Sequence, residues 1–226
     1  MPSLFAKPDE RTFSDTRPKV LFDGFDPLDV IAPYDVLWAG GAAAGGALTV
    51  ELVSADGPRE VTGEIGGLVL RATAMLDPDN ADLIIVPGAA GPISAPEDGR
   101  EIDTIPILLA RTLETGLPAL MRKALDNPRV TVATVCGGSL ALAMAGLLDG
   151  RHAVTRSPSS TTWAWTSSAP VATWSRHGGV TSGLDLGLYL LEREFGPRIA
   201  RSVEEMFAYE RRGTVWRDTG LEAVAL

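Results

Sequence analysis

Two short runs rich in apolar and β-branched residues constrain the fold of this 226-residue chain more than any other feature. One covers residues 81–86 (Ala-Asp-Leu-Ile-Ile-Val), and the other covers residues 130–135 (Val-Thr-Val-Ala-Thr-Val). Runs of this length and composition are typical of strands that are buried on both faces of a parallel sheet. Such a sheet is stable only when helices cover both of its faces, so the rest of the chain must supply them.

The remaining sequence alternates between strand and helix patterns. Pro118 is expected to break or kink the long helical pattern in which it lies, because proline has no amide hydrogen to donate. The alternation predicts an α/β fold with a mostly parallel sheet and helices on both faces. We predict strands over residues 19–22, 48–54, 81–86, 130–135 and 152–155, a hairpin turning at Gly66-Gly67 over residues 60–73, and helices over residues 29–38, 105–127, 140–148, 184–195 and 198–209.

Length and composition indicate one domain. The chain is 45% hydrophobic and 22% charged, as in globular proteins, and it shows neither an internal repeat nor a linker. We therefore expect a flexible N-terminal tail over residues 1–18, a single domain over residues 19–210 and a C-terminal extension over residues 211–226.

Charge and cysteine content exclude several classes of protein. The formal net charge of −9 argues against nucleic-acid binding, which needs a basic surface. No apolar stretch is long enough to span a membrane, and the first residues lack the apolar segment of a secretory signal. The single cysteine excludes an internal disulfide, so we expect a cytoplasmic location.

That cysteine, Cys136, carries the strongest chemical signal. It follows the strand predicted for residues 130–135 at once, and Gly137-Gly138-Ser139 and an Ala-rich helical pattern follow it. A residue held between a strand and a helix lies in a sharp turn, and the free N–H groups of the helix start favour a thiolate. The alternative is that Cys136 is a small buried apolar residue, and the local pattern leaves both interpretations open.

A catalytic cysteine needs a partner, and the candidates are histidines or carboxylates. His152 and His177 have no sequence context that marks a Cys-His pair, and the chain has too few His and Cys residues for a structural zinc site. Asp29 begins a predicted helix, where an acid is also common for purely structural reasons. The small residues 87–91 follow another strand, where they form either a ligand-binding loop or a plain turn. Carboxylates are the better candidates, because Asp23, Asp26, Asp29 and Asp35 surround the first strand-to-helix turn, and such turns lie at the carboxyl ends of strands, where ligands bind.

The ordered set of these segments resembles the ThiJ/PfpI superfamily, which shares its fold with class I glutamine amidotransferases. The resemblance covers most of residues 21–200, is closest to isocyanide hydratases, and implies a flavodoxin-like, doubly wound sheet in a three-layer sandwich. The matching segments are residues 21–29 (Leu-Phe-Asp-Gly-Phe-Asp-Pro-Leu-Asp), 84–88 (Ile-Ile-Val-Pro-Gly), 135–139 (Val-Cys-Gly-Gly-Ser), 145–151 (Ala-Gly-Leu-Leu-Asp-Gly-Arg) and 179–185 (Gly-Val-Thr-Ser-Gly-Leu-Asp).

The resemblance implies a role for four residues. Cys136 matches the nucleophile that attacks the isocyanide carbon, and Asp29 matches the acid that bonds to the thiol and transfers protons. Backbone N–H groups at Gly88 and Gly137 match the oxyanion-binding positions. Water then releases an N-substituted formamide. The resemblance implies a small-molecule substrate, no metal, no organic cofactor and a homodimer.

The sequence departs from the family at three points. Hydratases often have Thr after the cysteine, where this chain has Gly137. Glutamine amidotransferases and PfpI-like peptidases use a histidine there, so the glycine disfavours a peptidase. The family usually has a histidine where Arg156 stands.

Residues 156–177 fit neither a helix nor a strand pattern, and they hold three of the five Trp residues. An irregular surface loop is the simplest interpretation, although exposed Trp clusters are uncommon. In an alternative reading frame this segment can encode residues closer to the family's helix-then-strand pattern. We hypothesise a compensated frameshift, and resequencing the coding DNA tests it, since an intact frame would reject it.

Three other functions stay open. The first is ligand sensing, as in ThiJ/PfpI-type domains fused to AraC-type regulators, although residues 211–226 are too few for a DNA-binding module. The second is redox sensing through oxidation of Cys136, and the third is a glyoxalase-type reaction on small aldehydes. Turnover indicates a hydratase or related hydrolase, ligand binding without turnover indicates a ligand sensor, and sensitivity to peroxide indicates a redox sensor.

Overall fold

The computed structural model describes residues 16–97, 100–149, 151, 171–173 and 182–211. Within these residues the main sheet has six strands, in the order β5-β2-β1-β6-β7-β8, and every neighbouring pair is parallel. The order reverses between β1 and β6, which is the doubly wound arrangement expected from the sequence. The strands are β1 (Thr16–Leu21), β2 (Thr49–Ser54), β5 (Ala74–Met75), β6 (Leu83–Val86), β7 (Thr131–Thr134) and β8 (Val171–Thr173).

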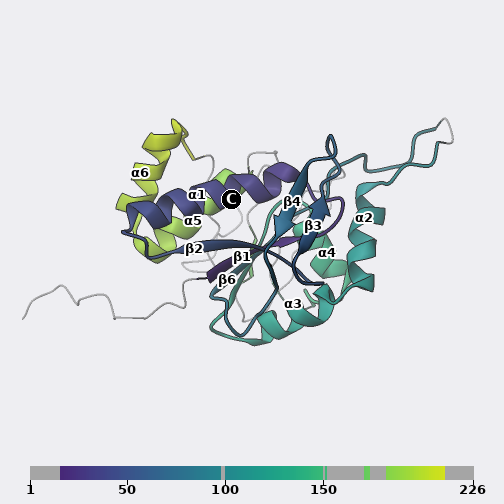
Figure 1. Ribbon diagram of the computed structural model, residues 1–226, viewed down its shortest axis with the longest axis horizontal. Coiled ribbons are helices and arrows are strands. Elements are labelled where there is room, and N and C mark those ends of the chain that lie inside the picture. The colour runs from purple at the N-terminus through teal and green to yellow at the C-terminus, as the bar shows by residue number, and fades with distance from the viewer. Residues whose placement is uncertain (1–15, 98–99, 150, 152–170, 174–181, 212–226) are drawn as a thin grey trace, which may run out of the picture.

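Helices cover both faces of this sheet, as predicted (Figure 1). On one face, α1 (Pro27–Ala43), α5 (Ser182–Phe195) and α6 (Pro197–Phe207) pack against apolar side chains of β6 and β7. On the other face, α3 (Leu117–Asp126) and α4 (Gly138–Met144) pack against the alternate side chains of the same strands. Both faces of the central strands are therefore buried, which explains their nearly unbroken apolar sequence.

A third apolar cluster closes the end of the sheet where the parallel strands finish. It joins the end of β1 to the antiparallel hairpin of β3 (Arg59–Thr62) and β4 (Val69–Ala72) and to α2 (Ile105–Arg111). Gly66 and Gly67 turn the hairpin with positive φ angles of 63° and 66°, which confirms the predicted hairpin and its turn.

The predicted break at Pro118 is also confirmed. The helical pattern over residues 105–127 is divided into α2, the short 3-10 turn η1 (Thr112–Glu114) and α3. Pro118 lies in the first turn of α3, where a missing amide hydrogen costs no helical hydrogen bond. The proline therefore starts a second helix instead of kinking a single long one.

Both ends of the described domain extend beyond the boundaries predicted from sequence. Strand β1 begins at Thr16 and pairs with β2 along its whole length, so residues 16–18 belong to the sheet and not to the tail predicted for residues 1–18. The sequence pattern did not predict this part of the strand, because Arg17 and Pro18 are not typical of a strand interior. At the other end, Arg211 bonds to Glu204 (2.6 Å) and to Glu192, which ties the start of the predicted extension to α5 and α6.

Two helices differ in length from their sequence patterns. Helix α1 continues to Ala43. Its small residues Ala39, Gly40 and Gly41 are buried, and a Cβ on either glycine would lie too close to Leu191 or Leu48. Helix α4 ends at Met144, shortly before Gly146 with its positive φ of 65°. The strand predicted for residues 152–155 lies outside the described residues, and β8 arises within the segment 156–177 that showed no strand pattern.

Candidate active site

Cys136 lies between β7 and α4 in a backbone conformation that few residues adopt. Its φ is +49°, and Ala208 is the one other non-glycine residue with a positive φ in the described part of the chain. This conformation costs about 1–2 kcal/mol for a residue with a Cβ. Hydrogen bonds on either side hold it, from Val135 N–H to Val86 O (3.0 Å) and from Gly138 N–H to Val135 O (2.9 Å). Cys136 is half-buried. The position of its thiol is fixed by this turn, which the sheet and α4 hold in place.

Asp29 is an almost completely buried acid near the start of α1. Its side chain is 1% exposed, and its Oδ2 accepts a hydrogen bond from Gly88 N–H (2.9 Å). Its Oδ1 has no hydrogen-bond partner among the residues that the structure describes. Burial raises the pKa of Asp29 to about 7 and the nearby Asp26 carboxylate adds to the rise, while the Gly88 N–H opposes it. The group can therefore hold or release a proton near neutral pH.

Asp26 supports this arrangement in two ways. Its Oδ1 accepts from Leu28 N–H (2.9 Å) and caps α1, and its backbone N–H donates to Gly88 O (2.9 Å). The start of α1 and the loop after β6 are thus joined by two hydrogen bonds, one through Asp26 and one through Asp29. These two hydrogen bonds fix the position of the Asp29 carboxyl group relative to the carboxyl end of the sheet.

Gly88 brings the acid and the cysteine turn together. A Cβ on Gly88 would lie 2.7 Å from Gly137 N and 2.9 Å from Asp29 Oδ2, closer than such atoms approach. The point between these two atoms stays open because residue 88 is glycine. At Gly137 a Cβ would meet its nearest neighbour, Leu109 Cδ1, at 3.6 Å, so that position tolerates a side chain.

The structure therefore places the four predicted site residues at one end of the sheet. Asp29, Gly88 and Gly137 surround a common point, and Cys136 precedes Gly137 in the chain. The Gly88 N–H is bonded to Asp29, whereas Gly137 N–H donates to no backbone carbonyl among the described residues. Their roles as oxyanion donors stay predictions.

The other sequence candidates lie elsewhere. Asp23 pairs with Arg59 (2.9 Å), and Asp35 is on the exposed side of α1. His152, Arg156 and His177 lie outside the described residues. Asp26 was one of the candidate carboxylates, but its role as the N-cap of α1 was not predicted, although an Asp directly before a helix start is a typical cap. Over the described part of the chain, no group of three His, Cys, Asp or Glu residues is arranged to hold a metal ion.

Comparison with known proteins identifies the superfamily. No family profile matches the sequence. An isonitrile hydratase from Pseudomonas putida is 30% identical over 203 residues, which cover 84% of this chain and 76% of that protein. The chain belongs to the ThiJ/PfpI superfamily. As a ThiJ/PfpI protein it has the expected fold, and its relatives include isonitrile hydratases.

Solved structures agree on the ThiJ/PfpI fold. The Drosophila melanogaster DJ-1beta structure superposes with a TM-score of 0.63 at 16% identity, over 87% of this chain and 98% of that one. A ThiJ/PfpI family protein from Pseudomonas syringae gives 0.61 at 18% identity, over 94% and 83%. No helix in the described ranges is long and apolar enough to cross a membrane.

Proposed function

We propose that this ThiJ/PfpI protein is a cysteine-dependent hydratase that converts an isocyanide and water into an N-substituted formamide. The observation that carries the proposal is the convergence of Asp29, Gly88 and Gly137 beside Cys136. The similarity to an isonitrile hydratase supports the choice of substrate class.

In the proposed first step, the Cys136 thiolate attacks the terminal carbon of R–N≡C and forms a C–S bond. Asp29, protonated near neutral pH, gives its proton to that carbon, so the product is the neutral thioimidate R–N=CH–S–Cys. The pKa of about 7 suits this transfer, because a general acid works best when its pKa lies near the working pH.

In the second step, water adds to the thioimidate carbon. Asp29, now a carboxylate, takes one proton from that water, and the second proton of the water passes to the imine nitrogen, which gives the tetrahedral intermediate R–NH–CH(O⁻)–S–Cys. Collapse of the intermediate breaks the C–S bond, expels the thiolate and leaves R–NH–CHO. The Gly137 N–H supports negative charge on the added oxygen, in the manner of an oxyanion hole.

The experiment is turnover of an aryl isocyanide to its formamide by the purified full chain, followed by the amide absorbance and by mass spectrometry. Cys136→Ala is expected to reduce turnover to background, and Asp29→Asn to reduce kcat by about 10²–10⁴-fold. Asp35→Asn, which removes an exposed carboxylate from the same helix, is the matched control and is expected to keep full activity.

A folded wild-type protein that turns over neither aryl nor alkyl isocyanides would reject isocyanide hydration. Turnover that survives in Cys136→Ala would reject the nucleophile. We also propose a homodimer, as the family resemblance implies, and sedimentation at a mass near that of one 23.8 kDa chain would contradict it.

A further inference from the structure

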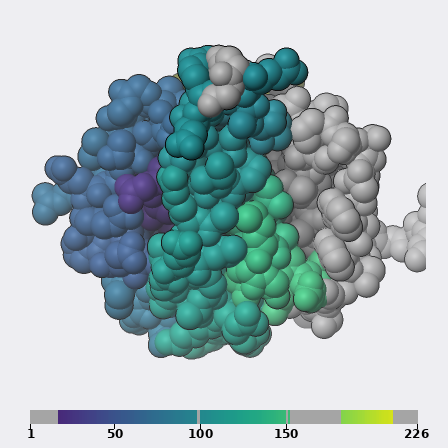
Figure 2. All heavy atoms as spheres, turned by 90° about the vertical axis from the view of Figure 1, so that its right-hand side faces the viewer, coloured from purple at the N-terminus to yellow at the C-terminus, as the bar shows by residue number. Residues whose placement is uncertain are grey.

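A cavity of about 330 Å³ opens between the β3–β4 hairpin and α2, beside the ends of β1 and β2. Figure 2 shows this side of the molecule, where the purple start of the described chain reaches the surface between the blue hairpin region and the teal helices. None of Asp29, Gly88, Cys136 and Gly137 lines it. Its volume is at the lower end of the range for pockets that bind small molecules.

The cavity has an apolar base. Leu21, Phe22, Leu108 and Leu117 line it, and each of these side chains is at most 6% exposed. These residues come from β1, α2 and the start of α3, which belong to the packed core and hold the shape of the base. An apolar part of a ligand would be removed from water here, which favours its binding.

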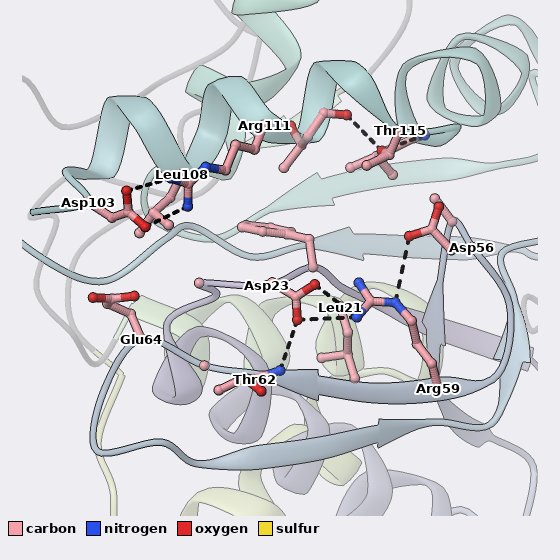
Figure 3. A pocket seen from close by; sticks show the side chains of 16 residues that line it. Leu21, Asp23, Asp56, Arg59, Thr62, Glu64, Asp103, Leu108, Arg111 and Thr115 are labelled. Atoms are coloured by element: carbon pink, nitrogen blue, oxygen red, sulfur yellow. Dashed lines mark hydrogen bonds and ion pairs between the residues drawn. The ribbon is translucent and has the colours of Figure 1, made fainter.

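The rim of the cavity is charged, and its arginines are already paired. Arg59 bonds to Asp23 (2.9 Å) and contacts Asp56 (3.6 Å) on the hairpin side. Across the cavity, Arg111 makes two hydrogen bonds to Asp103 (2.6 and 2.5 Å). Figure 3 shows both groups of ion pairs facing the space between the strands and α2. An anionic ligand would have to displace a carboxylate from one of these arginines.

Glu64 is the carboxylate of the rim that takes part in none of these ion pairs. Four acids and two arginines line the cavity, so its lining has an excess of two negative charges. Figure 3 places the Glu64 carboxylate on the hairpin side, opposite Asp103. Its backbone is fixed by a hydrogen bond from Glu64 N–H to Phe25 O (3.3 Å), and its charge helps to raise the pKa of Arg111, after the larger effect of Asp103.

We propose that this cavity is a second binding site, separate from the Cys136 site, for a small molecule with an apolar body and one cationic amine. The apolar body lies on the leucines and Phe22 of the base. The ammonium group lies between Glu64 and Asp103, where it offsets the excess negative charge without disturbing either arginine.

Three probes of one shape test the proposal by isothermal titration calorimetry on the full chain: cyclohexylmethylamine, cyclohexylmethanol and cyclohexanecarboxylate. The amine is expected to bind saturably with one site, and the alcohol and the carboxylate about tenfold more weakly or not at all. Added salt is expected to weaken amine binding, because partly exposed charges are screened.

Variants locate the site. Glu64→Gln is expected to weaken amine binding about fivefold, the size of a partly exposed ion pair. Glu60→Gln, which removes an exposed carboxylate from the same hairpin outside the cavity, is expected to change nothing. Thr62→Trp fills the cavity from an exposed strand position and is expected to abolish binding, while Cys136→Ala is expected to bind like the wild type.

Several results would overturn the proposal: no saturable binding of the amine, equal binding of amine and alcohol, equal effects of Glu64→Gln and Glu60→Gln, or retained binding in folded Thr62→Trp. Loss of amine binding in Cys136→Ala would assign the amine to the cysteine site instead. Thermal unfolding of each variant shows that it is folded, and the pair Glu64→Gln and Glu60→Gln decides the question if Thr62→Trp does not fold.

Discussion

Asp29 couples the stability of the protein to pH. Its pKa is raised to about 7 in the folded protein, against an ordinary value of 3.8. Between these two values the folded state binds more protons than the unfolded state, so the free energy of unfolding falls as pH rises from about 4 to about 7. This difference between the two pKa values lowers the free energy of unfolding above pH 7 by at most about 4 kcal/mol.

Asp29→Asn should remove this pH dependence, because the amide cannot ionise while its oxygen can still accept from Gly88 N–H. We expect the variant to unfold at a higher temperature than the wild type at pH 8 and at nearly the same temperature at pH 4. Calorimetric melting curves across this range provide the measurement, with Asp35→Asn as the control. Equal pH slopes for the wild type and Asp29→Asn would contradict the assignment.

Lys19 is a second buried ionisable residue, in the middle of β1. It is 1% exposed, its Nζ has no hydrogen-bond partner within the described ranges, and burial followed by the Arg17 charge lowers its pKa well below 10.5. Because the unfolded lysine is protonated more readily, the amine destabilises the fold at neutral pH, and this cost disappears as pH rises to about 10.5.

Lys19→Met should therefore raise the melting temperature at pH 7, on the order of a few degrees for each kcal/mol recovered. Methionine has a similar length and no charge, so the strand and its neighbours need little adjustment. The gain should shrink as the melts are repeated toward pH 10. A variant that is less stable than the wild type at pH 7 would show that the amine has a stabilising partner.

At the scale of elements, the approach of the β6 loop to the start of α4 depends on the missing side chain at Gly88. Gly88→Ala should place a methyl group between Gly137 N and Asp29 Oδ2 and push the acid away from the cysteine turn. We expect loss of at least about 10²-fold in kcat/KM, the effect of a displacement near 1 Å.

Gly137→Ala is the control, because its methyl group has room, and this variant should stay as stable as the wild type. Similar losses of activity and stability in both variants would argue against the close contact at Gly88.

Helices α1 and α5 approach closely at Gly187. A Cβ there would lie 2.7 Å from Val36 Cγ1 and 2.9 Å from Val36 Cβ, and a helical valine has little freedom to move away. Gly187→Ala should destabilise the protein by about 1–3 kcal/mol in urea unfolding. Gly116→Ala is the control, because its φ of −68° suits alanine and the nearest atom would be 3.7 Å away. A change smaller than about 0.5 kcal/mol for Gly187→Ala would show that the helices separate freely.

The elements that were predicted well are those with a local cause. The apolar runs over residues 81–86 and 130–135 form central strands because their alternate side chains face two helix layers. The glycine pair of the hairpin forms its turn because both residues adopt positive φ angles. The extra turns of α1 over residues 39–43 and the strand β8 were missed, because packing and pairing with distant segments produce them. No local pattern distinguishes such residues from loops.

At the scale of the whole molecule, parallel topology explains why the residues that the family resemblance named lie together at one end of the sheet. Asp29 follows β1, Gly88 follows β6 and Cys136 follows β7, and these strands are neighbours in the sheet. The charged cavity could not be predicted in the same way. Arg59 and Arg111 have no helix or strand periodicity that relates them, and only the folded hairpin and α2 bring them to one space.

The two hydrogen bonds between the start of α1 and the loop after β6 also bear on how the site opens. Asp26 donates its amide to Gly88 O, and Gly88 donates its own amide to Asp29 Oδ2. An opening that separates these segments frees both amides at once, so their native-state hydrogen exchange should report one shared opening free energy. Different values for the two amides would mean that the bonds break independently. An equal opening free energy for the two amides would mean that Asp29 and the loop after β6 open as one cooperative unit. The buried Asp29 carboxyl group would then contact bulk water only when this whole unit opens.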